Sequence, residues 1–147
     1  MSWSLIRAVA VCVVLAGCGS AQAEGMNDAD GMQEEYRAEL ARLEFPPDYS
    51  PAAEAAEGES GASYQSGLGR GAAGFQWLCA WSQEWISQRA LDSERADHAL
   101  DVLDTFPELD LWNNMDNTGR QTILAAVDEA RLNDPSGIQQ QVEAIGC

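Results

Sequence analysis

The segment 75–90 constrains the fold more than any other part of the chain. Its sequence is FQWLCAWSQEWISQRA, and on a helical projection its apolar side chains fall within an arc of about 200°. An arc this broad needs two or more neighbouring elements to cover it. The segment therefore predicts a central helix. The residues in the arc are Phe75, Trp77, Leu78, Cys79, Trp81, Trp85 and Ile86.

Within this segment Trp77, Trp81 and Trp85 recur every four residues and therefore share one face of the predicted helix. Two interpretations remain open. The stripe belongs to the core, which is the commoner case in small helical domains, or it is an exposed binding platform for a saccharide or a partner protein. In the second case Glu84, beside two of the indoles, is the first carboxylate to consider for sugar hydrolysis, although it falls on the polar face.

Helical periodicity also predicts helices over 26–43, 93–105, 116–132 and 136–147, with Asp, Asn or Ser side chains placed to cap several of them. No segment alternates as a sustained strand does. The fold class predicted is all-α, a small bundle of four or five helices forming a single domain over 26–147. The segment 48–74, rich in Gly, Pro and acidic residues, is expected to be irregular, with Tyr64 fixing it to the core.

The N-terminus has the layout of an export signal rather than of a folded element. Arg7 precedes the apolar run AVAVCVVL, which is too short to cross a bilayer, since a spanning helix needs roughly 20 apolar residues. The sequence Leu-Ala-Gly-Cys then ends at Cys18. We predict a signal peptide over 1–17 and a tether over 18–25.

This ending resembles the bacterial lipobox. The resemblance implies cleavage between Gly17 and Cys18, thioether attachment of diacylglycerol, with acyl chains such as palmitate, to the Cys18 thiol, and anchoring at the extracytoplasmic face of the cell membrane. Ala21-Gln22-Ala23 offers an alternative cleavage site after Ala23, which would release a secreted protein. The lipid-anchored form is preferred because the motif directly follows the apolar run.

Two cysteines remain once Cys12 leaves with the signal peptide and Cys18 carries the lipid. An even pair in an oxidising compartment favours a disulfide, so Cys79 and Cys147 are expected to be bonded. A redox or metal-binding thiol pair is the alternative, but the chain has no Cys-x-x-Cys motif and a single histidine, His98. We expect no metal and no cofactor.

The net charge of −16, reached with arginine and no lysine, makes nucleic acid an improbable ligand. Two further patterns favour structural interpretations. The segment 114–119 has the glycine of a calcium loop but not its acidic ligands, so capping explains it better. His98 lies between charged neighbours with no nucleophile at a spacing that would recruit it.

The residues Tyr64-Gln65-Ser66-Gly67 and Trp77-Leu78-Cys79-Ala80-Trp81 look similar to exported actinobacterial proteins without assigned function, over roughly 45–147. This resemblance implies no activity and no catalytic residue. We therefore expect a non-enzymatic binding or interaction module on the cell envelope, with an envelope protein or a saccharide as partner. A small carboxylate-dependent hydrolase or a sugar-binding accessory protein is the alternative.

Overall fold

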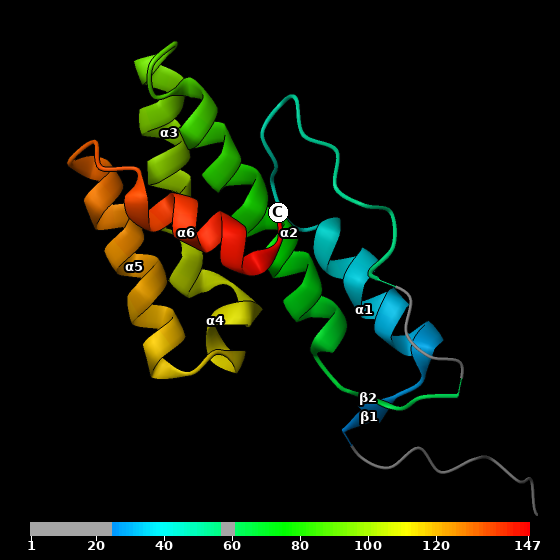
Figure 1. Ribbon diagram of the computed structural model, residues 1–147. Helices are drawn as coiled ribbons and strands as arrows, with labels where there is room; N and C mark the ends of the chain where they lie inside the picture. Colours follow the sequence, from blue (N-terminus) through cyan, green and yellow to red (C-terminus); the bar gives the residue numbers. More distant parts are fainter. Residues whose placement is uncertain (1–24, 57–60) are drawn as a thin grey trace, which may run out of the picture.

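The computed structural model describes residues 25–56 and 61–147 (Figure 1). Its helices are α1 (Ala29–Leu40), α2 (Leu68–Gln88), α3 (Ser93–Leu103), α4 (Asp110–Asn114), α5 (Asn117–Arg131) and α6 (Ser136–Ile145), with a 3-10 turn η1 (Phe106–Glu108) and strands β1 (Met26–Asn27) and β2 (Tyr64–Gln65). The predicted all-α class is confirmed. The signal peptide and Cys18 lie outside the described residues.

Two regions meet along α2, the longest helix (Figure 1). The first, which we call the arm, comprises the described residues up to 76: α1, the first half of α2, the two short strands and the chain between them. The second, the bundle, comprises 77–147: the second half of α2 with α3 to α6. The prediction of one central helix is therefore correct, but α2 serves two different sets of neighbours.

Aspartates begin three of the helices. The side chains of Asp28, Asp92 and Asp116 accept hydrogen bonds from backbone N–H groups in the first turns of α1, α3 and α5. Each occupies one of the donors that a helix start leaves unpaired. The sequence predicted these caps to within one or two residues.

Aromatic side chains fill the bundle core. Trp77, Trp81 and Trp85 are each 2% exposed, and Phe106 is fully buried against them and the inward residues of α3, α5 and α6. The indole N–H of Trp81 donates to the carbonyl of Glu44 at 3.0 Å. This bond fixes the chain that follows α1 to the bundle and satisfies a buried donor.

The arm packs in another way, through glycine. A Cβ atom added to Gly69 would lie 2.1 Å from the Met32 carbonyl oxygen of α1, so the two helix backbones approach more closely than any side chain permits. The buried apolar residues here are few: Met32, Tyr36, Ala55 and Ala73.

The predicted boundary of the irregular segment, 48–74, is wrong at its C-terminal end. Helix α2 begins at Leu68, directly after Gly67, whose φ of +93° favours glycine. Glycine is a weak helix former, so the composition of 68–74 predicts a loop. Tertiary contact overrides that preference, since only glycine permits the close approach to α1.

Residues 44–56 lie over the arm without regular structure, as expected. The side-chain amide of Gln33 makes two hydrogen bonds with the backbone of Ala55, and the Tyr36 hydroxyl donates to the Ala52 carbonyl. Tyr64 packs against the small arm cluster, so its predicted anchoring role is confirmed. In the strand β2, Tyr64 pairs with Asn27 and Gln65 pairs with Met26 of β1. Strands of two residues are too short to produce a recognisable alternation in the sequence.

The predicted disulfide is present. Cys79 in α2 and Cys147 after α6 are bonded, with Cα atoms 5.6 Å apart, within the usual range. The Gln83 amide also donates to the Cys147 carbonyl. The last residue of the chain is thus held to the middle of α2.

Candidate functional site

The tryptophan stripe does not form a platform. All three indoles are buried, and stacking on a ligand would need an exposed ring face. Of the two interpretations that the sequence left open, the structure places Trp77, Trp81 and Trp85 in the core. Their function is to join α2 to its neighbours.

The carboxylate considered for hydrolysis is engaged inside the fold. Glu84 is 9% exposed and accepts hydrogen bonds from the guanidinium of Arg95, with one oxygen 2.6 Å from Nη2. The same guanidinium contacts Asp48, and these hydrogen bonds to Asp48 and Glu84 raise the pKa of Arg95 above its usual value. His98 lies edge-on against Trp81 at a centroid distance of 5.5 Å.

The segment compared with a calcium loop is a helix start. The Asp116 carboxylate accepts the Gly119 N–H at 2.7 Å and caps α5. Across residues 25–56 and 61–147, no group of three or more histidine, cysteine or acidic side chains is placed to hold a metal ion.

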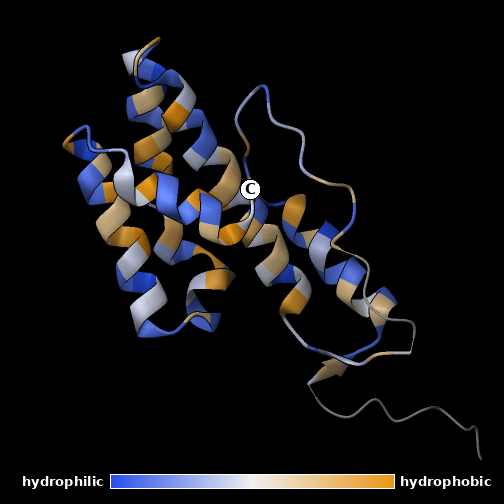
Figure 2. Cartoon of the chain, viewed as in Figure 1, coloured by the Kyte–Doolittle hydropathy of each residue, from blue (hydrophilic) through white to orange (hydrophobic). Residues whose placement is uncertain are grey.

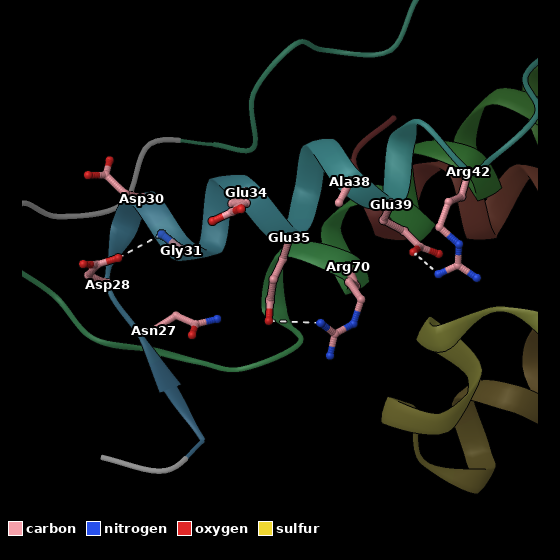
Figure 3. Close-up of a pocket in the computed structure, with 10 residues that line it drawn as sticks. All are labelled: Asn27, Asp28, Asp30, Gly31, Glu34, Glu35, Ala38, Glu39, Arg42 and Arg70. Carbon is pink, nitrogen blue, oxygen red and sulfur yellow. Dashed lines mark hydrogen bonds and ion pairs between the residues drawn. The ribbon is translucent and has the colours of Figure 1, made fainter. Parts of the chain in front are cut away.

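An acidic hollow of about 590 Å³ lies along α1 (Figure 3). Glu35 extends from α1 toward Arg70 of α2 and accepts hydrogen bonds from the backbone N–H of Gly67 at 2.8 Å and from Ser66 and Arg70 at 3.1 Å. Burial alone would raise the pKa of Glu35, but the hydrogen bond from Gly67, those from Ser66 and Asn27 and the charge of Arg70 lower it overall. This carboxylate is a clamp between helices.

A different surface has the character of a binding site. Three adjoining hollows of about 370, 730 and 660 Å³ share the partly buried ring of Phe75 in their walls. The first two also share Met115, and the last two share Ala144 and Ile145. We call the surface formed by these three hollows the Phe75 groove.

The walls of the Phe75 groove come from both regions of the molecule. The arm contributes the face of α2 from Leu68 to Phe75 and the chain around Ala55, whereas the bundle contributes α5 and α6. Figure 2 shows apolar, orange segments on α4 and α6 where they approach α2. Leu68, which lines the first of the three hollows, is 50% exposed.

Small residues keep the groove open beside a close helix contact. A Cβ atom on Gly137 of α6 would lie 2.8 Å from the Ala126 Cα of α5, so these helices pack tightly, and both residues line the hollow of about 730 Å³, called the trough below. In the wall of the trough the buried amide of Gln141 donates to the Ser82 hydroxyl at 3.0 Å. Its Oε1 is the one buried side-chain polar atom of the described ranges without a hydrogen-bond partner.

Sequence reasoning assigned Phe75 to the core with the rest of its arc. The signal that separates it from the tryptophans is the run Gly69 to Gly74, which includes three glycines and two alanines. Of this run, Gly71 and Ala72 line the groove beside the ring, and side chains this small leave the ring uncovered on that side. The exposed Leu68 precedes the same run.

Comparison with protein-family models, curated proteins and solved structures finds no match to this chain. A search of the described helices also finds none that is long and apolar enough to cross a membrane.

Proposed function

We propose that this protein is a lipid-anchored cell-envelope protein that binds an apolar segment of an envelope partner protein in the Phe75 groove. The observation that carries the proposal is the position of Phe75, a single aromatic ring at the junction of three hollows. Binding energy at protein interfaces concentrates in a few aromatic anchors surrounded by drier, weaker contacts.

The lipobox ending at Cys18 supports the location on the extracytoplasmic face of the membrane. The disulfide between Cys79 and Cys147 supports it independently, because such bonds persist in oxidising compartments outside the cytosol. If Cys18 is acylated, replacing it with serine moves the protein from the membrane fraction to the soluble fraction. A Cys18→Ser variant that stays with the membrane would contradict the lipid anchor.

The composition of the groove supports docking rather than catalysis. Its lining is mostly alanine, glycine and larger apolar residues, and the polar side chains that line it come from several different elements. Sites that bind extended partners combine such apolar floors with polar rims.

Two surface leucines, Leu68 and Leu91, make a matched cross-linking experiment possible. A photoreactive amino acid placed at Leu68, inside the groove, is compared in intact cells with one at Leu91, which is 82% exposed but lies in the turn between α2 and α3. The proposal predicts a discrete cross-linked product from position 68 and none from 91. Adding Phe75→Ala should remove that product while the thermal unfolding of the protein stays cooperative.

Equal capture from both positions would mean that the leucines report general surface proximity, and the docking proposal would be wrong. The proposal would also be wrong if position 68 still gave the cross-linked product in the Phe75→Ala variant, because Phe75 would then contribute nothing to binding.

A further inference from the structure

The arginines of the described chain are all engaged within the fold. Each one contacts a carboxylate, a backbone carbonyl or an indole ring of the protein itself. They are Arg37, Arg42, Arg70, Arg89, Arg95, Arg120 and Arg131.

Many carboxylates, in contrast, are not paired with an arginine. Within residues 25–56 and 61–147, more than half of the acidic side chains have no arginine within ion-pair distance. The chain has no lysine with which to neutralise them. A partner that brings its own cations therefore meets a complementary surface, and one that brings carboxylates is repelled.

The Phe75 groove follows the same asymmetry. Its charged lining residues are Glu54, Asp116 and Glu129, and none is basic. Glu129 and Asp116 lie on α5 and at its start, and Glu54 lies across the groove in the arm, where its well-exposed side chain also contacts Arg37. Three carboxylates from two regions thus line a mostly apolar surface, and of these Asp116 and Glu129 have no arginine within ion-pair distance. We call the three the acidic rim.

From this arrangement we propose that the occupant of the groove is a cationic amphipathic helix of a partner protein, with leucine-like side chains toward Phe75 and lysine or arginine toward the acidic rim. This deepens the proposed function and rests on it. An amphipathic helix presents one apolar stripe with charges beside it, which is the complement of this surface.

The dimensions suit such a helix. The α5 wall runs from Asp116 to Glu129, a rise of about 20 Å at roughly 1.5 Å per residue. A partner helix of three to four turns spans about the same length. Acids near both ends of this wall then meet cations spaced along the partner.

Two other occupants fit less well. A second copy of this chain would bring more carboxylates to the acidic rim and no lysine. An anionic lipid surface would be repelled by the same rim. The test below distinguishes both from a basic helix.

The probe is a labelled synthetic helix of about 14 residues built from leucine and lysine at amphipathic spacing, with a second peptide in which glutamate replaces every lysine. The full chain is reconstituted in phosphatidylcholine nanodiscs, and empty nanodiscs provide the blank. Fluorescence anisotropy measures the dissociation constant between about 50 mM and about 300 mM salt, a range over which the screening length falls roughly twofold.

The decisive variants carry three neutral replacements each. Glu54→Gln, Asp116→Asn and Glu129→Gln together remove the rim charges, and Asn retains the helix cap at 116. Glu94→Gln, Asp97→Asn and Asp128→Asn change the net charge equally at exposed positions outside the groove lining. We expect the rim variant to bind the lysine peptide about tenfold more weakly with a reduced salt dependence, and the matched variant to change binding less than twofold.

The outcomes separate the two proposals. Equal binding of the lysine and glutamate peptides, both lost with Phe75→Ala, overturns the cationic partner and leaves the groove as a docking site. Equal weakening in the two triple variants shows general charge attraction and overturns the inference. Lysine-peptide binding that Phe75→Ala leaves unchanged, or cross-linking from Leu68 to a second copy of the chain, overturns it as well.

Discussion

The arm and the bundle share one helix but are stabilised by different means. In the bundle, α2 presents three buried indoles to α3, α5 and α6 and is bonded covalently to the end of the chain. In the arm, the same helix presents glycine, and α1 is held by backbone contact, a small cluster and the hydrogen bonds of Glu35.

The difference has a consequence for where function lies. Burial of large apolar side chains supplies most of the stability of a domain. We therefore expect the bundle to contribute most of the free energy of unfolding, and the arm to unfold locally at a lower free-energy cost than the bundle. The Phe75 groove is bordered by both regions. Its geometry therefore depends on how firmly the arm is held.

The largest effect should come from the bundle core. Trp81→Ala leaves a cavity in the aromatic core and removes the donor to the Glu44 carbonyl, and we expect a loss of about 3–5 kcal/mol in the free energy of unfolding. Urea denaturation followed by circular dichroism measures it, with exposed Leu91→Ala as a control that should change little. A loss below about 1 kcal/mol would mean that the core does not dominate.

Removing the disulfide should be the next largest change. Cys79→Ala with Cys147→Ala relaxes a loop of 68 residues and should lower stability by about 2–4 kcal/mol. Calorimetry quantifies the loss, and hydrogen exchange should show faster exchange in α6 with little change in α1. If α1 is affected more than α6, the two regions are not separated as described.

Gly69→Ala should act on the arm alone. The added Cβ would collide with the Met32 carbonyl oxygen, so α1 must move away, at a cost of about 1–3 kcal/mol. Gly71→Ala is the matched control in the same helix, because its Cβ has no neighbour closer than 3.9 Å and alanine favours helix. Hydrogen exchange of α1 should rise in the first variant only.

The Glu35 clamp makes the arm sensitive to acid. Because the folded arm lowers the pKa of Glu35 below 4.5, its contribution is fully present above pH 4.5 and is lost as the pH falls through the lower folded value. Glu35→Gln should cost about 1–2 kcal/mol at neutral pH and flatten this dependence. Exchange rates of α1 amides across the acid range test it, and an unchanged profile in the variant would assign the effect to another carboxylate.

An effect of similar size to that of Glu35→Gln concerns the polar pair beside the groove. Ser82→Ala alone leaves the buried amide of Gln141 with neither partner and should cost about 1–2 kcal/mol. The double replacement Ser82→Ala with Gln141→Leu should recover most of that, since two apolar groups replace two polar ones. A double variant less stable than the single one would show that the amide contributes through contacts other than this bond.

Sequence patterns predicted the bundle better than the arm. Its helices have apolar residues at helical spacing, aspartate caps and an even cysteine pair, all of which are local or countable signals. The start of α2 at Leu68 was missed because its cause is contact with α1, distant in the sequence. The Phe75 groove was missed for a related reason: periodicity shows that a ring faces inward, but not whether a neighbour covers it.

Hydrogen exchange with and without the lysine peptide tests the central claim most directly, that a partner binds where the arm and the bundle meet. If a partner binds there, exchange slows upon binding in the first half of α2 and in α5 and α6, from both regions at once, and does not change in α3. Protection confined to the acidic face of α1, or spread evenly over the chain, would contradict it.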